Sequence, residues 1–350
     1  MAVEGEFPKS DGDILFGSEV NSFNNIESAL AGGEITTFSE LGDSTYDATS
    51  ALFAVSSTVF IRLTGSGSDT TKRGTLSSGV ITWTFVDDQV STPAQGAMAD
   101  DDGTDIIISN STGDASFSTD GGQNFTGATT NLVSANPVKD MHYVTGGAFA
   151  VAVGDGSAGG TNIGAWYTTN GGVDWTQATS GAGHFVAVSM FSTTVGFAVD
   201  DSGNVYKTTN GAVDWTDTTT NVNANVTRML ALTTSTFITV ATDIIHTGDD
   251  AGNSNQRTRF GRGGRASNIL KATNGNLYII VGPLTSSSVI SIIKSTDGGI
   301  TWSIKIIGAQ SSSSVDYTST NQYTYLTEYD TNKLAFCVDQ QIYVIDESYR

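Results

Sequence analysis

The most concentrated chemistry in the sequence is a basic segment on an acidic chain. The whole chain carries a formal net charge of −20 at pH 7, yet four arginines stand close together in the segment Gln256–Arg265. They are Arg257, Arg259, Arg262 and Arg265. Arginine binds carboxylates and phosphates through a planar fork of donors, and the glycines of this segment permit close approach of a backbone. The segment predicts a site for an anionic partner; the alternative is that it neutralises the neighbouring Asp249 and Asp250 or an adjacent subunit.

Two histidines form the second candidate group. His142 and His184 are 42 residues apart, and a repeat of that length would place them at equivalent positions, with Arg228 at the same place in the next repeat. The alternative is that they simply face solvent. The chain has three histidines, too few to predict a trihistidine zinc site unless the fold gathers them, and we expect neither a metal nor a cofactor.

Aspartates are plentiful, so pairs of carboxylates arise by chance. Asp100–Asp102 and Asp200–Asp201 stand beside glycines and are interpreted as turns between the second and third strands of a sheet. Asp100, Asp102 and Asp105 have a spacing that could hold Ca²⁺, but the closing glutamate of a calcium loop is missing. The one cysteine, Cys337, stands in an apolar run and is interpreted as a buried thiol.

The charge and composition exclude several classes of partner. A net charge of −20 repels nucleic acids and anionic membranes. The N-terminus has early acidic residues and no apolar stretch of secretory length, so we expect no classical signal peptide. Forty glycines, many Ser, Thr and Asn, and four prolines indicate short strands joined by tight turns.

A repeated eight-residue pattern must position these groups. We call its four copies the boxes: Ser118–Phe125, Thr168–Trp175, Thr208–Trp215 and Ser295–Trp302. The third residue of each box, an Asp or Asn, is expected to accept hydrogen bonds from the following turn, and glycine supplies its positive φ. The closing aromatic is expected to pack between neighbouring sheets. These structural residues are Asp120, Asn170, Asn210, Asp297, Phe125, Trp175, Trp215 and Trp302.

The boxes resemble the Asp-box, or bacterial neuraminidase repeat, S-x-D-x-G-x-T-W, which is found in sialidases, in photosystem II assembly factors and in other β-propellers. The resemblance implies a propeller in which the boxes lie away from the usual ligand face. Sialidases also clamp a carboxylate with three arginines, and here the nearest match to their first arginine run, Phe60–Leu63, has neither the order nor the proline. The resemblance therefore covers the residues that define the fold and not the catalytic residues of sialidases.

The spacing of the boxes predicts the number of blades. Phe125, Trp175 and Trp215 are 50 and 40 residues apart, and Trp302 follows 87 residues later, which is two blades with a degenerate box between them. At about 43 residues per blade, six blades of four antiparallel strands run from about residue 48 to 308. The template blade has strands at 184–190, 195–200, 204–209 and 213–218.

A seventh blade is expected to close the ring. The C-terminal segment offers three strands, at 323–328, 333–338 and 341–345, and an isolated candidate strand lies at 34–39. We predict that this N-terminal strand pairs with 341–345 and removes an exposed edge. Residues 1–32 are expected to form an extension with a short helix over 18–30, and residues 33–350 the propeller. The start of the extension is similar to some phage and archaeal-virus structural proteins, so residues 1–30 are expected to attach the protein to a larger particle.

The sequence favours a non-catalytic binding or structural module, extracellular or on a virion surface, that recognises a glycan or a protein, without nucleic acid and without membrane insertion. Two alternatives remain open at this point. One is a sialidase-like glycoside hydrolase with unrecognised carboxylates, and the other is an assembly factor of the photosystem II type. The predicted binding residues are Arg257, Arg259, Arg262 and Arg265 at the rim of the face away from the boxes, with His142, His184 and Arg228 nearer the channel.

Overall fold

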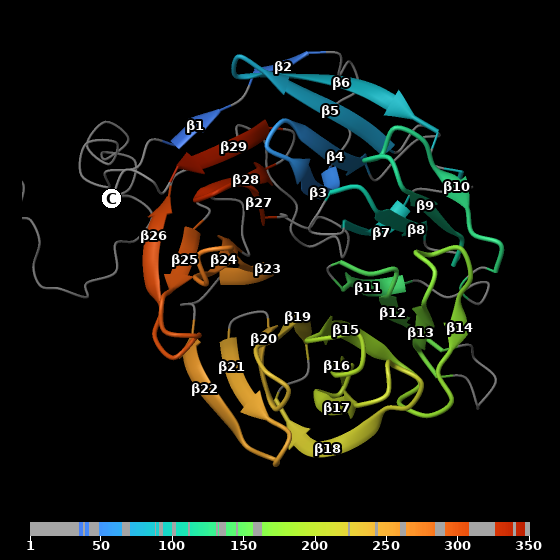
Figure 1. The fold of residues 1–350 in the computed structure, drawn as a ribbon. Coiled ribbons are helices and arrows are strands. Elements are labelled where there is room, and N and C mark those ends of the chain that lie inside the picture. The colour runs from blue at the N-terminus through green and yellow to red at the C-terminus, as the bar shows by residue number, and fades with distance from the viewer. Residues whose placement is uncertain are drawn as a thin grey trace, which may run out of the picture.

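A computed structural model of the chain shows seven β-sheets arranged as blades around a central axis (Figure 1). The described residues contain strands and turns and no helix, so none of them forms a helix able to cross a bilayer. The structure describes residues 35–37, 39–41, 49–64, 71–87, 89–90, 94–99, 103–110, 113–130, 132, 138–144, 146–156, 163–222, 225–241, 244–259, 264–283, 291–307, 326–338 and 341–346.

Each blade is an antiparallel sheet whose first strand lies at the axis and whose fourth lies at the rim. Blades 1 to 3 are β3–β6 (Thr49–Ser56, Val59–Thr64, Thr71–Ser77, Val80–Val86), β7–β10 (Ala94–Ala99, Ile106–Asn110, Ala115–Ser118, Thr126–Gly127) and β11–β14 (Val138–Tyr143, Ala150–Gly154, Ala165–Thr168, Thr176–Gln177). Blades 4 to 6 are β15–β18 (Phe185–Met190, Gly196–Asp200, Asn204–Thr208, Thr216–Asn221), β19–β22 (Val226–Ala231, Thr236–Ala241, Ile244–Asp249, Ser254–Arg259) and β23–β26 (Gly264–Lys271, Leu277–Pro283, Ser291–Ser295, Ser303–Ile307). Blade 7 is β27–β29 (Leu326–Asp330, Lys333–Val338, Gln341–Asp346) with β1 (Ile35–Thr37).

The predicted seven blades, their four-stranded antiparallel sheets and the mixed last blade are confirmed. In the template blade the first three strands agree with the prediction within one residue, but the fourth begins at Thr216 and not at Val213. The reason is local, because residues 211–215 belong to the box turn. The predicted helix over 18–30 lies outside the described residues.

The N-terminal segment closes the ring through two short strands, β1 and β2. β1 pairs antiparallel with β29, with Ile35 opposite Ile345, as predicted. The chain then crosses to the first blade, where β2 (Ser39–Leu41) pairs parallel with β6, with Ser39 opposite Val80. The sequence did not predict this fifth strand of blade 1. We call β1 and β2 together the clasp, because they join the last blade to the first.

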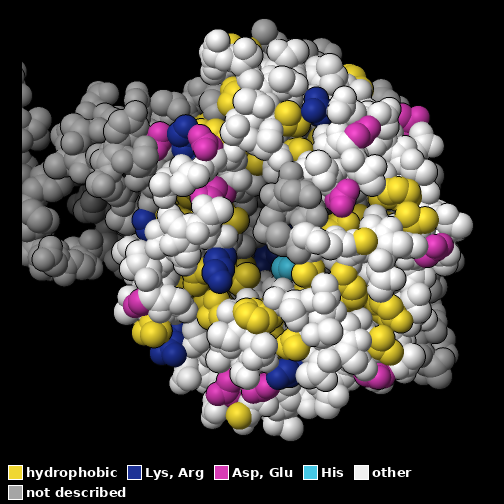
Figure 2. Space-filling view, viewed as in Figure 1, with side chains coloured by type: hydrophobic (Ala, Val, Ile, Leu, Met, Phe, Trp, Pro, Cys, Tyr) yellow, Lys and Arg dark blue, Asp and Glu magenta, His cyan; other side chains and the backbone are white. Residues whose placement is uncertain are grey.

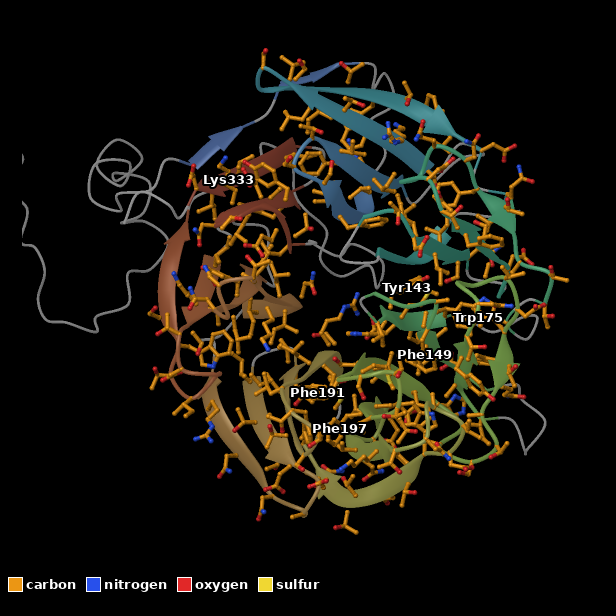
Figure 3. The ribbon with its side chains drawn as sticks, viewed as in Figure 1. Tyr143, Phe149, Trp175, Phe191, Phe197 and Lys333 are labelled. Carbon is orange, nitrogen blue, oxygen red and sulfur yellow. The ribbon has the colours of Figure 1, made fainter. Side chains whose placement is uncertain are left out.

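The hydrophobic core lies between neighbouring blades and not within them. One buried cluster joins Phe149, Val151 and Val153 of blade 3 to Phe185, Met190 and Trp215 of blade 4. Another joins Ile107 of blade 2 to Trp166 and Trp175 of blade 3. Figure 3 shows side chains filling the spaces between the sheets, with Phe149 and Trp175 among those labelled. Each box aromatic is therefore part of a contact between two blades, as predicted.

The fifth residue of each box packs against the second strand of the preceding blade. A Cβ added to Gly122, Gly172 or Gly299 would lie 2.5, 3.0 or 2.4 Å from the Cδ1 atom of an isoleucine there, namely Ile61, Ile107 or Ile238. The box of blade 4 has alanine at this position, and Ala212 is buried in one cluster with Val151. Val151 occupies the register position of Ile107 and Ile238, and valine has no Cδ1 atom. The alanine therefore fits where the preceding strand is one methyl group smaller.

The strand order gives the ring two different faces. Turns between first and second strands, and between third and fourth strands, lie on one face, which also carries the boxes; we call it the box face. Turns between second and third strands, and the connections between blades, lie on the opposite face, the connection face.

Candidate functional site: the connection face

The box side chains are used within their own turns. In all four boxes the hydroxyl of the first residue accepts a hydrogen bond from the N–H of the fifth, at 2.8 to 3.0 Å, and donates to the side-chain oxygen of the third. The side-chain oxygen of the third residue accepts the N–H of the seventh at 2.9 to 3.0 Å. These hydrogen bonds stabilise the hairpin of each box.

The two box aspartates at the third position are held in their charged form. Burial alone raises the pKa of Asp120, but hydrogen bonds from Asn124, Ser118 and Gln123 outweigh it and lower that pKa to about 2. Hydrogen bonds from Thr301 and Ser295 lower the pKa of Asp297 to about 2. A carboxyl with a pKa near 2 is a poor general acid at neutral pH, which agrees with a structural role.

In two boxes the Asp and Asn positions are exchanged, and the displaced aspartate links neighbouring blades. Asp174 Oδ1 accepts a hydrogen bond from Thr130 Oγ1 at 3.0 Å, and Thr130 follows the last strand of the preceding blade. Asp214 accepts hydrogen bonds from Thr179 and Ser180 in the same way. The second carboxylate oxygen of each accepts the amide of Asn170 or Asn210. Aspartates on the box face are thus hydrogen-bonded to the preceding blade.

The arginine segment does not form the long loop that the sequence suggested. Arg257 and Arg259 lie in β22 and Arg265 in β23, so the connection between blades 5 and 6 is reduced to residues 260–263, which include Arg262 and lie outside the described residues. Strand pairing explains the difference, because residues 254–259 pair with β21 and residues 264–271 pair with β24. The prediction that the segment opens on the connection face agrees with this topology.

The aspartates expected to neutralise these arginines have other partners. Asp250 forms an ion pair with Lys207 of blade 4 at 2.5 Å. Asp249 accepts hydrogen bonds from Ala251 and Asn253. Arg257 is exposed, stands at a β-bulge between β21 and β22, and donates from Nε to Thr247 Oγ1 at 2.6 Å. For Arg257, the one of the four whose side chain the structure describes, neutralisation of Asp249 and Asp250 is not the observed role.

The predicted equivalence of His142, His184 and Arg228 is wrong. In the strand register His142 matches Ser189 and Leu230, whereas Arg228 matches Asp140 and Ala187. His184 precedes β15 on the connection face, but His142 lies one residue from the box-face end of β11. The cause is a long turn in blade 3, where residues 155–164 separate the second and third strands, against residues 201–203 in blade 4. Figure 2 shows a histidine and basic side chains bordering the central opening.

A buried ion pair links inner strands of blades 3 and 5 across blade 4. Arg228 Nε lies 4.0 Å from Asp140 Oδ1, with the two side chains 10% and 13% exposed. Asp140 Oδ2 accepts the backbone N–H of Val188 in β15 at 3.0 Å, so one carboxylate of blade 3 contacts both blade 4 and blade 5. Burial raises the pKa of Asp140, and the positive charge of Arg228 and the Val188 N–H oppose that shift.

A second, exposed network stands beside this pair. Asp155 lies 3.4 Å from both Lys139 Nζ and His184 Nδ1, and backbone pairing between Asp155 and His184 fixes the arrangement. Lys139 is the neighbour of Asp140 in β11. We call Lys139, Asp140, Asp155, His184 and Arg228 the mouth cluster, because they lie at or next to the connection-face ends of β11, β12, β15 and β19.

Sequence reasoning found two of these five residues and missed three. Lys139, Asp140 and Asp155 carry no motif, and the Asp140–Arg228 pair joins residues 88 positions apart. Their shared signal is structural: Asp140 and Arg228 each follow the bulge that interrupts pairing of the first and second strands of their blade. Within one sequence that bulge has no signature.

The turn assignment of the acidic run 100–102 is also corrected. It lies between the first and second strands of blade 2, β7 and β8, and so belongs to the box face; its residues are outside the described ones. Asp201 does lie in a turn between second and third strands, as predicted, and Asp200, the last residue of β16, accepts the N–H groups of Ser202 and Asn204 in that turn. Among the residues that the structure describes, no three His, Cys, Asp or Glu side chains are grouped to hold a metal ion.

No protein-family model matches the chain, and no curated protein matches it. Solved structures do match. "YCF48 bound to D1 peptide" is 13% identical with a TM-score of 0.59, over 90% of this chain and 94% of that one. The RRP9 WD40 repeats are 9% identical with a TM-score of 0.65, over 89% and 99%. The GH74 enzyme of Niastella koreensis is 13% identical with a TM-score of 0.60, over 86% of this chain, which spans 43% of that enzyme. At these identities the likeness shows the seven-bladed propeller fold.

Proposed function

We propose that this propeller is a non-catalytic binding module that recognises an anionic segment of a protein partner on its connection face. The observation that carries the proposal is the distribution of basic side chains. Lys139, Arg228, Arg257, Arg259 and Arg265 lie in strand halves nearest that face, in blades 3, 5 and 6 of a chain with net charge −20. A local positive region on an acidic protein attracts anionic partners and orients their approach.

The contrast between the faces supports this assignment. On the box face, the box carboxylates accept hydrogen bonds from their own turns and from the preceding blade, which leaves them committed to the scaffold. On the connection face, Lys139 and His184 are 41% and 58% exposed. The likeness to YCF48 bound to D1 peptide and to WD40 propellers is compatible with a protein partner, although it extends to the fold alone.

The direct test measures binding of the purified chain to three probes at low and at physiological salt. The probes are a fluorescent peptide of alternating glutamate and glycine, its lysine–glycine counterpart, and a set of sialylated and sulfated glycans. We expect the acidic peptide to bind, more weakly as salt rises. A chain that binds glycans and not the peptide would refute a protein partner and restore the glycan predicted as the other ligand class.

The likeness to a GH74 enzyme supplies the second candidate, a glycoside hydrolase. Hydrolysis of β-glucans or of aryl glycosides by the pure chain would refute the non-catalytic assignment. The assembly-factor hypothesis is a special case of protein binding and passes or fails with the peptide test. The predicted virion or extracellular location and the attachment role of residues 1–30 stay predictions, to be tested by whether a peptide of these residues binds purified particles of the source.

A further inference from the structure

The mouth cluster combines the buried Arg228 with two exposed basic residues, Lys139 and His184, at one site. Arg228 pairs with Asp140, donates from Nη1 to Thr227 O at 2.8 Å and has a side chain 10% exposed, whereas the side chains of Lys139 and His184 are 41% and 58% exposed. Three basic side chains face two carboxylates, Asp140 and Asp155. Exposed ion pairs of this kind contribute little to stability, about 0–1 kcal/mol, so stability alone does not account for Lys139 and His184.

Asp140 meets Arg228 in a weak geometry. Their closest atoms, Asp140 Oδ1 and Arg228 Nε, are 4.0 Å apart, whereas charge-assisted arginine–carboxylate hydrogen bonds are usually about 2.7–2.9 Å long and often bidentate. Burial disfavours the charged form of Asp140, as its raised pKa indicates. The better hydrogen bond of Asp140 is the one from Val188 N–H, which an uncharged amide oxygen at this position would also accept.

We propose that the mouth cluster binds a carboxylate side chain of an acidic protein segment. In the unbound protein Asp140 pairs with Arg228 and so competes with that carboxylate for the arginine. Lys139 and His184 meet further carboxylates of the same segment at the surface. Arg265 is the second residue of β23, the inner strand of blade 6. This inference rests on the proposed function and gives it a site, a ligand group and a mechanism of competition.

Charge complementarity selects the occupant. The whole chain has a net charge of −20, which repels an acidic ligand at long range, so an acidic segment can be held only where basic side chains are grouped, as Lys139, His184 and Arg228 are here. An extended acidic segment fits this arrangement because its carboxylates recur along its length, as the basic residues Lys139, His184 and Arg228 recur over blades 3 to 5.

The experiment compares the affinity of the glutamate–glycine peptide for the full chain and for variants. Asp140→Asn keeps the acceptor for Val188 N–H and removes the competing charge, so we expect about two- to fivefold tighter binding. Arg228→Met removes the receiving cation, and we expect at least about tenfold weaker binding. Lys139→Met, at an exposed position, is expected to weaken binding without loss of thermal stability and covers the case in which Arg228→Met fails to fold.

The matched controls use the Lys207–Asp250 ion pair on the box side of blades 4 and 5. Asp250→Asn and Lys207→Met make the same charge changes away from the cluster and should leave affinity within about twofold of the unchanged chain. An unchanged or lower affinity for Asp140→Asn would overturn the competitor role, while peptide binding by the unchanged chain would still uphold the proposed function. Absence of peptide binding by every variant would overturn both.

A further measurement tests whether the N-terminal segment of the chain itself occupies the mouth cluster. Residues 1–34 of this chain carry seven acidic residues and one lysine, so they are themselves an acidic segment. A peptide of residues 1–34 that binds more tightly than the glutamate–glycine peptide, and concentration-dependent association of the full chain, would overturn the assignment to another protein and make the site an interface between copies.

Discussion

The packing of the box glycines leads to a quantitative prediction about Gly299. Replacing Gly299 by alanine places a Cβ 2.4 Å from Ile238 Cδ1, and Ile238 is fully buried, so the isoleucine cannot move without displacing its neighbours. Over-packing of this kind costs about 1–3 kcal/mol. The backbone adds a second cost of roughly 1–2 kcal/mol, because Gly299 has φ +88°, in the left-handed region. Gly299→Ala should therefore lower the free energy of unfolding by about 2–5 kcal/mol.

The two costs can be separated by a second substitution. Ile238→Val removes the Cδ1 atom that the new Cβ meets, at a cost of about 0.5–1.5 kcal/mol by itself. In the double variant the steric cost should disappear and the backbone cost should remain, so the coupling between the two sites should be about 1–3 kcal/mol. Blade 4 already contains this combination, with Ala212 at φ +64° and Val151 at the corresponding position of the preceding strand.

The assay is urea unfolding of the four proteins in the cycle, followed by fluorescence and circular dichroism. Coincident transitions are required, because a ring of seven blades need not unfold in one step. Val151→Ile, expected to destabilise by pressing on Ala212, and its rescue by Ala212→Gly are the matched cycle in blade 4. Coupling below about 0.5 kcal/mol in both cycles would refute the steric account and attribute the glycine preference to the backbone alone.

Three further outcomes are expected. Trp175→Ala should destabilise by about 3–5 kcal/mol in urea unfolding, through lost packing between blades 2 and 3, while peptide affinity of the folded fraction is unchanged; a selective loss of affinity would contradict the structural role. The folded pKa of Asp297, about 2, is below its ordinary value of 3.8, so its contribution to stability is present above pH 4 and lost as pH falls from about 4 to 2. Asp297→Asn should flatten that part of the stability–pH curve, and an unchanged slope would contradict this. Deletion of residues 1–41 should lower the melting temperature well below that of a chain lacking only residues 1–34, which keeps the clasp, and equal melting temperatures would show that the clasp adds no stability.

The blades could be predicted from the sequence because the box is a local structure. Its hydrogen bonds join residues at most four positions apart, as between Asp297 and Thr301, so the residues that specify the turn also stand together in the sequence. The closing strand was predictable for a different reason: three strands at one end and one at the other leave a single way to complete a blade. β2 was not, since three residues in a parallel pair with Val80–Thr82 form no recognisable pattern.

The site was predictable only in part. The arginine segment stood out by charge, but its strands were hidden, because polar residues on an exposed rim strand lack the alternation that identifies a half-buried one. The position of Arg228 relative to His142 and His184 depended on counting residues, and one long turn in blade 3 shifted the count. The contact of Asp140 with Arg228 depends on the ring bringing blades 3 and 5 within reach of each other, which a repeat length does not reveal.

The clasp makes the time of synthesis part of the folding problem. Ile35 leaves the ribosome early, and its partner Ile345 is made 310 residues later, which at about 5–20 residues per second is a wait of roughly 15 to 60 s. During that interval six blades can assemble side by side as an open arc, with β2 already able to pair on blade 1 and hold β1 beside the gap. The first strand of the propeller to be translated is thus among the last to find its sheet, and the arc becomes a ring only when the final strand arrives.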